Sequence, residues 1–187
     1  MAIRTMGPSG QYETGLDAAG AVLPELLAPA GGLDQMLAAI AAGADALIVA
    51  DAGLACALSA AIPGVEIHLS TQAGVHSEGA VRLAADELGV ERVTTARELT
   101  VDEIAALCAT GVPIEVFCHG AICIGYSGAC EFSALRRGRS AMRGDCAQPC
   151  RLAYDLVDEA GRALSPSKGI ACCARATIWV LRICPSL

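Results

Sequence analysis

The 187-residue chain is poor in aromatic side chains, which make up only 3% of it, and it has no P-loop and no long uncharged apolar run. With so few rings, an RNA-binding platform built by stacking bases on Phe and Tyr is excluded. No apolar stretch reaches the roughly 20 residues of a spanning helix, and residues 1–21 lack the apolar core of a signal peptide. The net charge of −7 excludes a generic polyanion binder. We therefore expect a cytoplasmic protein with no membrane span.

Cysteine, in contrast, is abundant, and five of the ten cysteines lie between residues 118 and 150. Cytoplasmic thiols stay reduced, so such a group favours metal binding or catalysis over disulfides. Cys123, Cys130, Cys146 and Cys150 are irregularly spaced, which is typical of the thiolate ligands of an iron–sulfur cluster, whereas structural zinc has two tight pairs. Three alternatives stay open: small buried hydrophobic residues, zinc ligands, or redox-active thiols without metal.

Apolar runs and segments of helical periodicity alternate from residue 25 to residue 118, with short connections between them. This alternation predicts βα units and a parallel sheet, and hence an α/β fold. The expected strands are 25–29, 46–50, 65–70, 91–96 and 114–118, and the expected helices are 33–42, 51–61, 77–88 and 100–108.

Two of these helices carry clear start signals. Asp51 can accept hydrogen bonds from free amides at the start of one helix, and Thr100 with Glu103 forms a capping box at the start of another. In the helix 77–88, the periodicity predicts that Val81, Leu83, Ala84 and Leu88 point inward.

Polar residues gather where the expected strands end. In parallel α/β sheets, ligands bind beyond the carboxyl ends of the strands. Gln72, Glu98 and His119 lie at such ends, and we expect them to contribute to substrate binding. The alternative is that they are ordinary loop residues and helix caps.

A basic segment adjoins the cysteines in this otherwise acidic chain. It consists of Arg136, Arg137, Arg139, Arg143 and Arg151. These side chains could bind a carboxylate or an RNA backbone, and the alternative is a solvated loop whose arginines pair with surface acids. Nearby, residues 125–128 nearly match the G-x-S-x-G nucleophile elbow, but Ala129 stands where glycine is required.

Several longer motifs resemble the peptidase U32 family, the collagenase-like proteins. The strongest are Glu115–Cys123 (EVFCHGAIC) followed by Gly128–Cys130 and Ser133, and Arg143–Arg151 (RGDCAQPCR). Weaker matches are Glu25–Leu33, Gly43–Ala46, His68–Gln72 and Ala96–Leu99. The resemblance runs from about residue 24 to residue 166.

The resemblance implies an incomplete (β/α) TIM-barrel-like sheet of about five βα units with a Cys-rich loop at 118–151. The residues themselves predict a β-hairpin after this loop, formed by 151–157 and 162–164. We divide the chain into a flexible N-terminus (1–22), the family domain (23–164), and a tail (165–187) outside the family with no evident partner. Family members have further βα units before residue 46. Our hypothesis is therefore an internal deletion and, after Pro166, a shifted reading frame.

The resemblance also implies two activities. One is iron–sulfur-dependent, oxygen-independent hydroxylation of a tRNA or rRNA base or of a quinone precursor, with prephenate as oxygen source in some RNA hydroxylases. The other is a collagenase-like peptidase. We favour the first, because four thiolates account for the cysteine spacing and no nucleophile–base pair is evident.

In the hydroxylase interpretation, Cys123, Cys130 and Cys146 bind a 4Fe-4S cluster. The fourth ligand is Cys150 or, as in some family members, a cysteine further downstream, near Cys172 in this chain. The alternatives to the cluster are zinc or no metal. The basic segment would then orient RNA or a small anion such as prephenate. A third hypothesis is a truncated, non-functional fragment, because five strands leave open edges that a homo- or hetero-dimer could cover.

Overall fold

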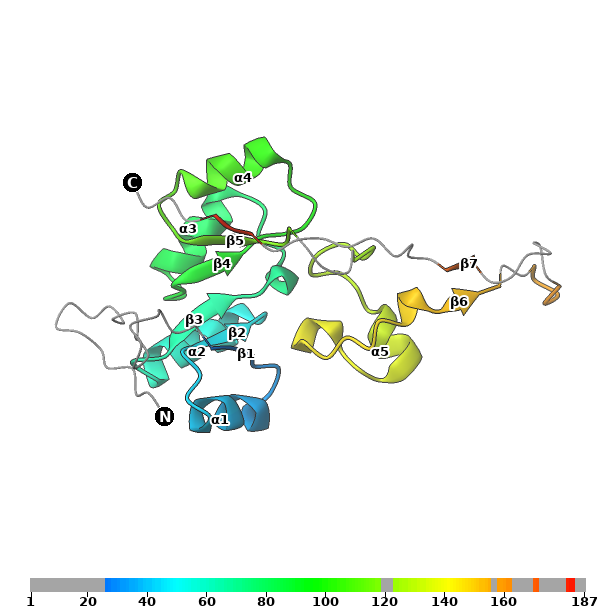
Figure 1. Ribbon diagram of the computed structural model, residues 1–187, viewed down its shortest axis with the longest axis horizontal. Coiled ribbons are helices and arrows are strands. Elements are labelled where there is room, and N and C mark those ends of the chain that lie inside the picture. The colour runs from blue at the N-terminus through cyan, green and yellow to red at the C-terminus, as the bar shows by residue number, and fades with distance from the viewer. Residues whose placement is uncertain (1–25, 119–122, 156–157, 163–169, 172–180, 184–187) are drawn as a thin grey trace, which may run out of the picture.

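A parallel sheet that alternates with helices forms the body of the protein (Figure 1). The structure is a computed structural model and describes residues 26–118, 123–155, 158–162, 170–171 and 181–183. Strands β1 to β5 lie side by side in chain order, all parallel, and α1 to α4 connect them. The predicted α/β class and the TIM-barrel-like arrangement of five parallel strands are therefore confirmed.

The element bounds lie within a few residues of those predicted. The strands are β1 (Leu27–Pro29), β2 (Ala46–Val49), β3 (Glu66–Leu69), β4 (Arg92–Thr94) and β5 (Ile114–Val116), and the helices are α1 (Leu33–Ala41), α2 (Ala52–Ala61), α3 (Glu78–Asp86) and α4 (Val101–Cys108). The Asp51 carboxylate accepts the Leu54 amide proton at 2.7 Å, and the capping box of Thr100 and Glu103 is complete. Both predicted caps are confirmed.

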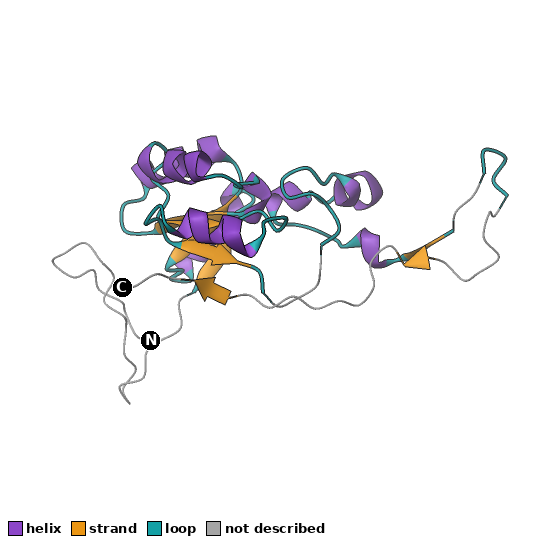
Figure 2. Cartoon of the chain, turned by 90° about the horizontal axis from the view of Figure 1, so that it is seen from above, coloured by secondary structure: helices purple, strands orange, loops and turns teal. Residues whose placement is uncertain are grey.

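The hydrophobic core lies between one face of the sheet and the helices. Alternate strand residues such as Leu47, Ile67 and Val93 are fully buried there, and helix residues such as Leu58 and Leu107 pack in the same cluster. Figure 2 shows the helices mainly on one side of the strands. Because successive strand side chains point to opposite faces, the other face is left for a different set of residues.

The predicted inward face of α3 is partly wrong. Val81 and Ala84 are buried, and Leu88 packs partly against the core, but Leu83 is 55% exposed. Two residues along an α-helix correspond to about 200° of rotation, so Leu83 points away from the face that buries Val81.

The cysteine-rich segment contains short helical turns that the sequence did not indicate. They are α5 (Phe132–Arg137) and the 3₁₀ turns η2 (Ala141–Arg143) and η3 (Pro149–Arg151), and another 3₁₀ turn, η1 (Thr71–Ala73), follows β3. Each spans six residues or fewer, too short to produce a periodic hydrophobic pattern.

The tail pairs with earlier strands, which corrects the expectation that it has no partner. The amide of Asp158 donates to the Arg162 carbonyl at 2.9 Å, in the predicted hairpin turn. However, β6 (Ala153–Tyr154) pairs antiparallel with β7 (Ile170–Ala171), and not with 162–164, of which only residue 162 is described. β8 (Leu181–Ile183) pairs antiparallel with β5. Pairings between distant strands leave no local signal in a single sequence.

No helix in the described part of the chain combines the length and the apolar character needed to cross a membrane. The longest of them, α2, has 10 residues, about half of what a bilayer requires.

Two substitutions in α3 test the core. Val81→Ala removes buried methyl groups and should lower the free energy of unfolding by about 2 kcal/mol. Leu83→Ala removes a larger but exposed side chain and should change it by less than about 0.5 kcal/mol. Urea denaturation of both variants measures the difference. A greater loss for Leu83→Ala would contradict the orientation of α3.

Candidate functional site

The turn at residues 125–128 lies over the carboxyl ends of β3 and β4, where two predicted site residues hold it. The Ser127 amide donates to Glu98 Oε1 at 2.8 Å, and the Gly128 amide donates to Gln72 Oε1 at 3.2 Å. Gln72 belongs to η1 after β3, and Glu98 follows β4. Both side chains therefore contact the backbone of the cysteine-rich segment, which the sequence did not predict.

Arg97 and Ser127 complete this set of contacts. The Arg97 amide donates to Ser127 Oγ at 3.1 Å, and its Nη2 donates to the Gly125 carbonyl at 3.4 Å. Ser127 is only 3% exposed. Partial burial raises the pKa of Glu98, but hydrogen bonds from the Ser127 amide and hydroxyl outweigh burial and hold that pKa below its usual value. Glu98 is thus an ionised acceptor at neutral pH.

Gly125 brings two cysteines together. A Cβ atom at this position would lie 3.0 Å from the Cys130 sulfur and 3.7 Å from the Cys123 sulfur. The Cys123 thiol also points to the Gly125 carbonyl, with a sulfur–oxygen distance of 3.7 Å. One point in space is therefore close to both sulfurs, and the lack of a side chain at Gly125 leaves that point open.

The second cysteine pair, Cys146 and Cys150, flanks a tight turn. The Gln148 amide donates to the Cys146 sulfur at 3.4 Å, and Gln148 adopts a left-handed conformation with φ of 50°. Backbone N–H groups aimed at sulfur stabilise a thiolate and are common around iron–sulfur ligands. Cys150 lies two residues beyond this turn, in η3.

Ser133 connects the two pairs. Ser133 is 2% exposed, and its hydroxyl accepts the Ala147 amide at 2.9 Å. The residue after Cys146 is therefore held against Ser133, which lies three residues after Cys130. Aromatic packing supports the same junction, because the Phe132 and Tyr154 rings lie 5.7 Å apart and the Tyr154 hydroxyl donates to the Pro149 carbonyl.

The four cysteines supply the right donors for an iron–sulfur cluster, although they do not form a complete cage in this conformation. None of the four forms a disulfide with another described residue, and Cys123 and Cys146 are exposed. Among the described residues, no three His, Cys, Asp or Glu side chains are close enough to hold a metal ion. Four thiols on one segment, with Cys123 and Cys130 close to the same point at Gly125, fit the donor chemistry of a cluster.

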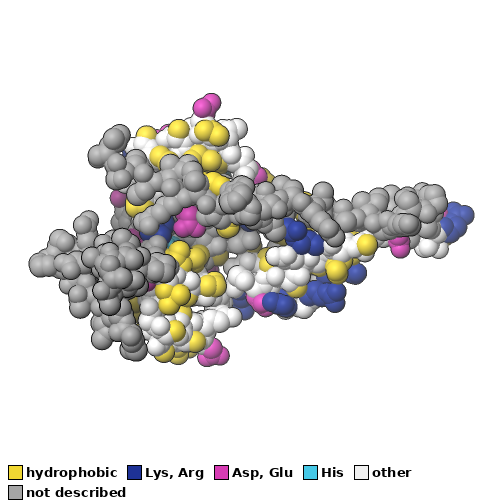
Figure 3. Space-filling view, in the orientation of Figure 1, with side chains coloured by type: hydrophobic (Ala, Val, Ile, Leu, Met, Phe, Trp, Pro, Cys, Tyr) yellow, Lys and Arg dark blue, Asp and Glu magenta, His cyan; other side chains and the backbone are white. Residues whose placement is uncertain are grey.

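The predicted arginines lie near these cysteines but do not converge on one point. Arg136 stacks over the Tyr154 ring at 5.7 Å, and Arg139 donates to Asp145 at 2.9 Å. Arg137 and Arg143 are exposed, and Arg151 is half-buried in η3. Figure 3 shows Lys and Arg side chains gathered over the part of the molecule that contains α5.

His119 lies outside the described residues, so its predicted role is not tested. The structure instead reveals a polar row on the sheet face opposite the core, formed by Glu66, His68, Arg92, Thr94 and Glu115. His68 is buried and lies 2.9 Å from Glu66, and Arg92 lies 4.0 Å from Glu115. The alternation of polar and apolar residues in these strands is the signal that could have identified this row.

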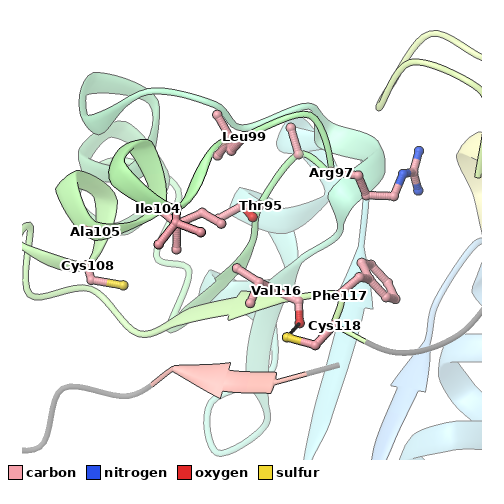
Figure 4. Close-up of a pocket in the computed structure, with 11 residues that line it drawn as sticks. Thr95, Arg97, Leu99, Ile104, Ala105, Cys108, Val116, Phe117 and Cys118 are labelled. Atoms are coloured by element: carbon pink, nitrogen blue, oxygen red, sulfur yellow. Dashed lines mark hydrogen bonds between the residues drawn. The ribbon is translucent and has the colours of Figure 1, made fainter. Parts of the chain in front are cut away.

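An apolar cavity of about 430 Å³ lies between α4 and the ends of β4 and β5 (Figure 4). Leu99, Ile104 and Val116 line it together with the thiols of Cys108 and Cys118. Arg97, which hydrogen-bonds the turn at residues 125–128, lies at the edge of this cavity, but Figure 4 shows its side chain directed away from it.

This fold and site define a TIM-barrel-like βα protein whose cysteine-rich segment lies over the carboxyl ends of the strands. The sequence profile of peptidase family U32 matches residues 31–175. The chain belongs to this family, which confirms the resemblance seen in the sequence motifs.

Relatives within the family carry names of two kinds. The chain is 46% identical over 108 residues to the 23S rRNA 5-hydroxycytidine C2501 synthase of Escherichia coli K12, covering 57% of this chain and 16% of that protein. It is 43% identical over 100 residues to the tRNA hydroxylation protein P1 of Bacillus subtilis 168, covering 53% of this chain and 24% of that protein. A collagenase of Porphyromonas gingivalis W83 is 40% identical over 106 residues, which cover 51% of this chain and 26% of that protein. The chain thus spans about a quarter or less of these relatives.

Gly31 tests how the cysteine-rich segment docks on the sheet. A Cβ atom there would lie 1.8 Å from the Arg143 carbonyl oxygen, so Gly31→Ala must push the segment off the end of β1. We expect a loss of about 2 kcal/mol in unfolding free energy. Gly79→Ala is the control, since nothing lies within 4 Å of its Cβ and alanine favours α3. Equal stability of both variants in urea denaturation would contradict this docking.

Proposed function

We propose that the protein is part of an iron–sulfur-dependent enzyme that hydroxylates an RNA base without dioxygen. The observation that carries this proposal is the pair of tethered cysteine sets over the carboxyl ends of the strands, the place where parallel βα folds bind substrates. Two relatives named for rRNA and tRNA hydroxylation support it. An RNA substrate also fits the cytoplasmic location expected from the sequence.

In this proposal Cys123, Cys130, Cys146 and Cys150 hold a 4Fe-4S cluster. Bound there, the cluster supplies redox chemistry that none of the amino acid side chains offers. The role of the chain is to present thiolates, to direct the Gln148 amide at the Cys146 sulfur, and to keep the two pairs joined through Ser133.

RNA is favoured over a quinone precursor because of the charge near the cysteines. Five arginines lie in the segment from Arg136 to Arg151 of an acidic chain, and the exposed Arg137 and Arg143 can contact phosphates. The same charges could hold a small anion such as prephenate beside the RNA.

The peptidase alternative has less support in the geometry. His68 contacts Glu66, and the ring of His76 contacts the Gly74 carbonyl. Neither contact pairs a histidine base with a serine or cysteine nucleophile, as covalent peptidase chemistry would require. Ser127 is buried and bonded to the Arg97 amide, so it is poorly placed to attack a peptide.

Metal content tests the cluster. After anaerobic reconstitution, the chain should carry about four irons and four acid-labile sulfides. Cys123→Ser and Cys146→Ser should each lose most of both, because each removes a thiolate ligand. Cys56→Ser is the matched control, since this thiol is exposed on α2 and outside the cysteine-rich segment. A colourless protein that binds zinc instead of iron would refute the cluster.

Arginine variants test the RNA surface. Arg137→Ala and Arg143→Ala should each weaken binding of a short RNA hairpin and reduce the salt dependence of log Kd by about one unit of slope. Arg162→Ala is the control, because its side chain is 80% exposed but lies outside the arginine segment, paired with Asp158. Fluorescence anisotropy at several salt concentrations measures the slopes. If log Kd has the same salt dependence in all three variants, Arg137 and Arg143 do not contact the RNA.

A further inference from the structure

We infer that Glu98 and Ser127 are positioning residues that hold the Cys123 and Cys130 thiols side by side as a preformed half of a metal site. This inference rests on the proposed thiolate site and specifies how the sheet builds half of it. It gives Glu98 a different role from the substrate contact expected from the sequence.

The first step is the fixed position of the turn between the two cysteines. The Ser127 amide is bound by Glu98, the Ser127 hydroxyl is bound by the Arg97 amide, and the Gly128 amide is bound by Gln72. The acceptors on Glu98 and Gln72 come from the ends of two neighbouring strands. A turn bound at three points by a rigid sheet cannot rotate or slide without losing these hydrogen bonds.

The second step links the turn to the sulfurs. Arg97 Nη2 donates to the Gly125 carbonyl, and the Cys123 thiol approaches that same oxygen at 3.7 Å. A Cβ atom on Gly125 would lie within 4 Å of both sulfurs. The backbone that the sheet holds is therefore the backbone around which the two thiols meet.

The third step separates positioning from general stability. Glu98 is an exposed residue outside the hydrophobic core cluster, so its hydrogen bond acts on the turn and not on the core. Glu103 offers the same chemistry elsewhere, because its carboxylate accepts the Thr100 amide at 2.7 Å at the start of α4. Loss of either carboxylate removes a hydrogen bond to a backbone amide, but only Glu98 bears on the cysteines.

The experiment uses phenylarsine oxide, whose arsenic bonds two adjacent thiols and releases water. The full metal-free chain is treated with the reagent, the remaining thiols are alkylated, and mass spectrometry locates the bridged pair. Glu98→Ala and Ser127→Ala should slow bridging of Cys123 with Cys130 about tenfold, the lower end of the effect of losing a residue that orients metal ligands. Glu98→Gln keeps an oxygen acceptor and should restore most of the rate.

Glu103→Ala is the matched control and should bridge within about twofold of the wild-type rate. A cooperative thermal transition reports whether each variant is folded. Wild-type bridging rates in both Glu98→Ala and Ser127→Ala would overturn the inference, as would failure of the wild-type chain to form the bridged pair.

These outcomes are distinguishable from failure of the proposed function. If the reconstituted chain carries no iron and sulfide but bridging still depends on Glu98 and Ser127, the cluster is wrong and the positioning role stands. If the cluster forms but the bridging rate is unchanged in the Glu98 and Ser127 variants, the positioning role is wrong and the cluster stands.

Discussion

The hydrogen bonds between Ser127 and the end of β4 are the constraint on which the rest of the site depends. They fix the turn at residues 125–128 over the sheet, and that turn determines where Cys123 and Cys130 can lie. Without them, the turn would keep only the hydrogen bonds of Gly128 with Gln72 and of Arg97 with Gly125, and the segment would still contact the sheet where Arg143 lies against Gly31. The ends of the strands therefore form a rigid support for the site, and the cysteine-rich segment is held over them by a few polar contacts.

The polar row on the opposite face of the sheet follows from the same architecture. In a barrel that face is the interior, where polar side chains can be buried only with partners. Glu66 supplies a partner for the buried His68, and Glu115 supplies one for Arg92. The chain thus keeps the two faces of its sheet chemically distinct, with an apolar face toward the helices and a paired, charged face opposite.

Most of the fold could be predicted from the sequence, because its signals are local. Asp51 and Thr100 start helices through their own side chains, and the buried run at Ala46–Val49 is typical of a strand covered on both faces. The inward orientation predicted for Leu83 is wrong because the buried face of α3 is narrower than the hydrophobic pattern suggests. The pairing of β7 with β6 and of β8 with β5 could not be predicted, since each joins segments that are not adjacent in the chain.

The candidate site was predictable in its chemistry but not in its contacts. Cysteine spacing indicated thiolate ligands, and the strand-end rule selected Gln72 and Glu98. The contacts of those two side chains depend on the path of the segment after β5. The spacing of residues in the sequence does not predict that path. In the sequence Ser127 belongs only to an imperfect nucleophile elbow, whereas in the structure it is buried and hydrogen-bonded to Arg97 and Glu98, which gives it a structural role.

The Ser133 hydroxyl has a consequence for local concentration. By accepting the Ala147 amide it closes a loop of 14 residues, which keeps the turn carrying Cys146 within a few residues' reach of Cys130. Closing so short a loop costs little chain entropy, and a short tether maintains an effective concentration on the order of millimolar. The two thiol pairs belong to one chain, and the buried hydroxyl raises the effective concentration of one pair around the other by shortening the segment between them.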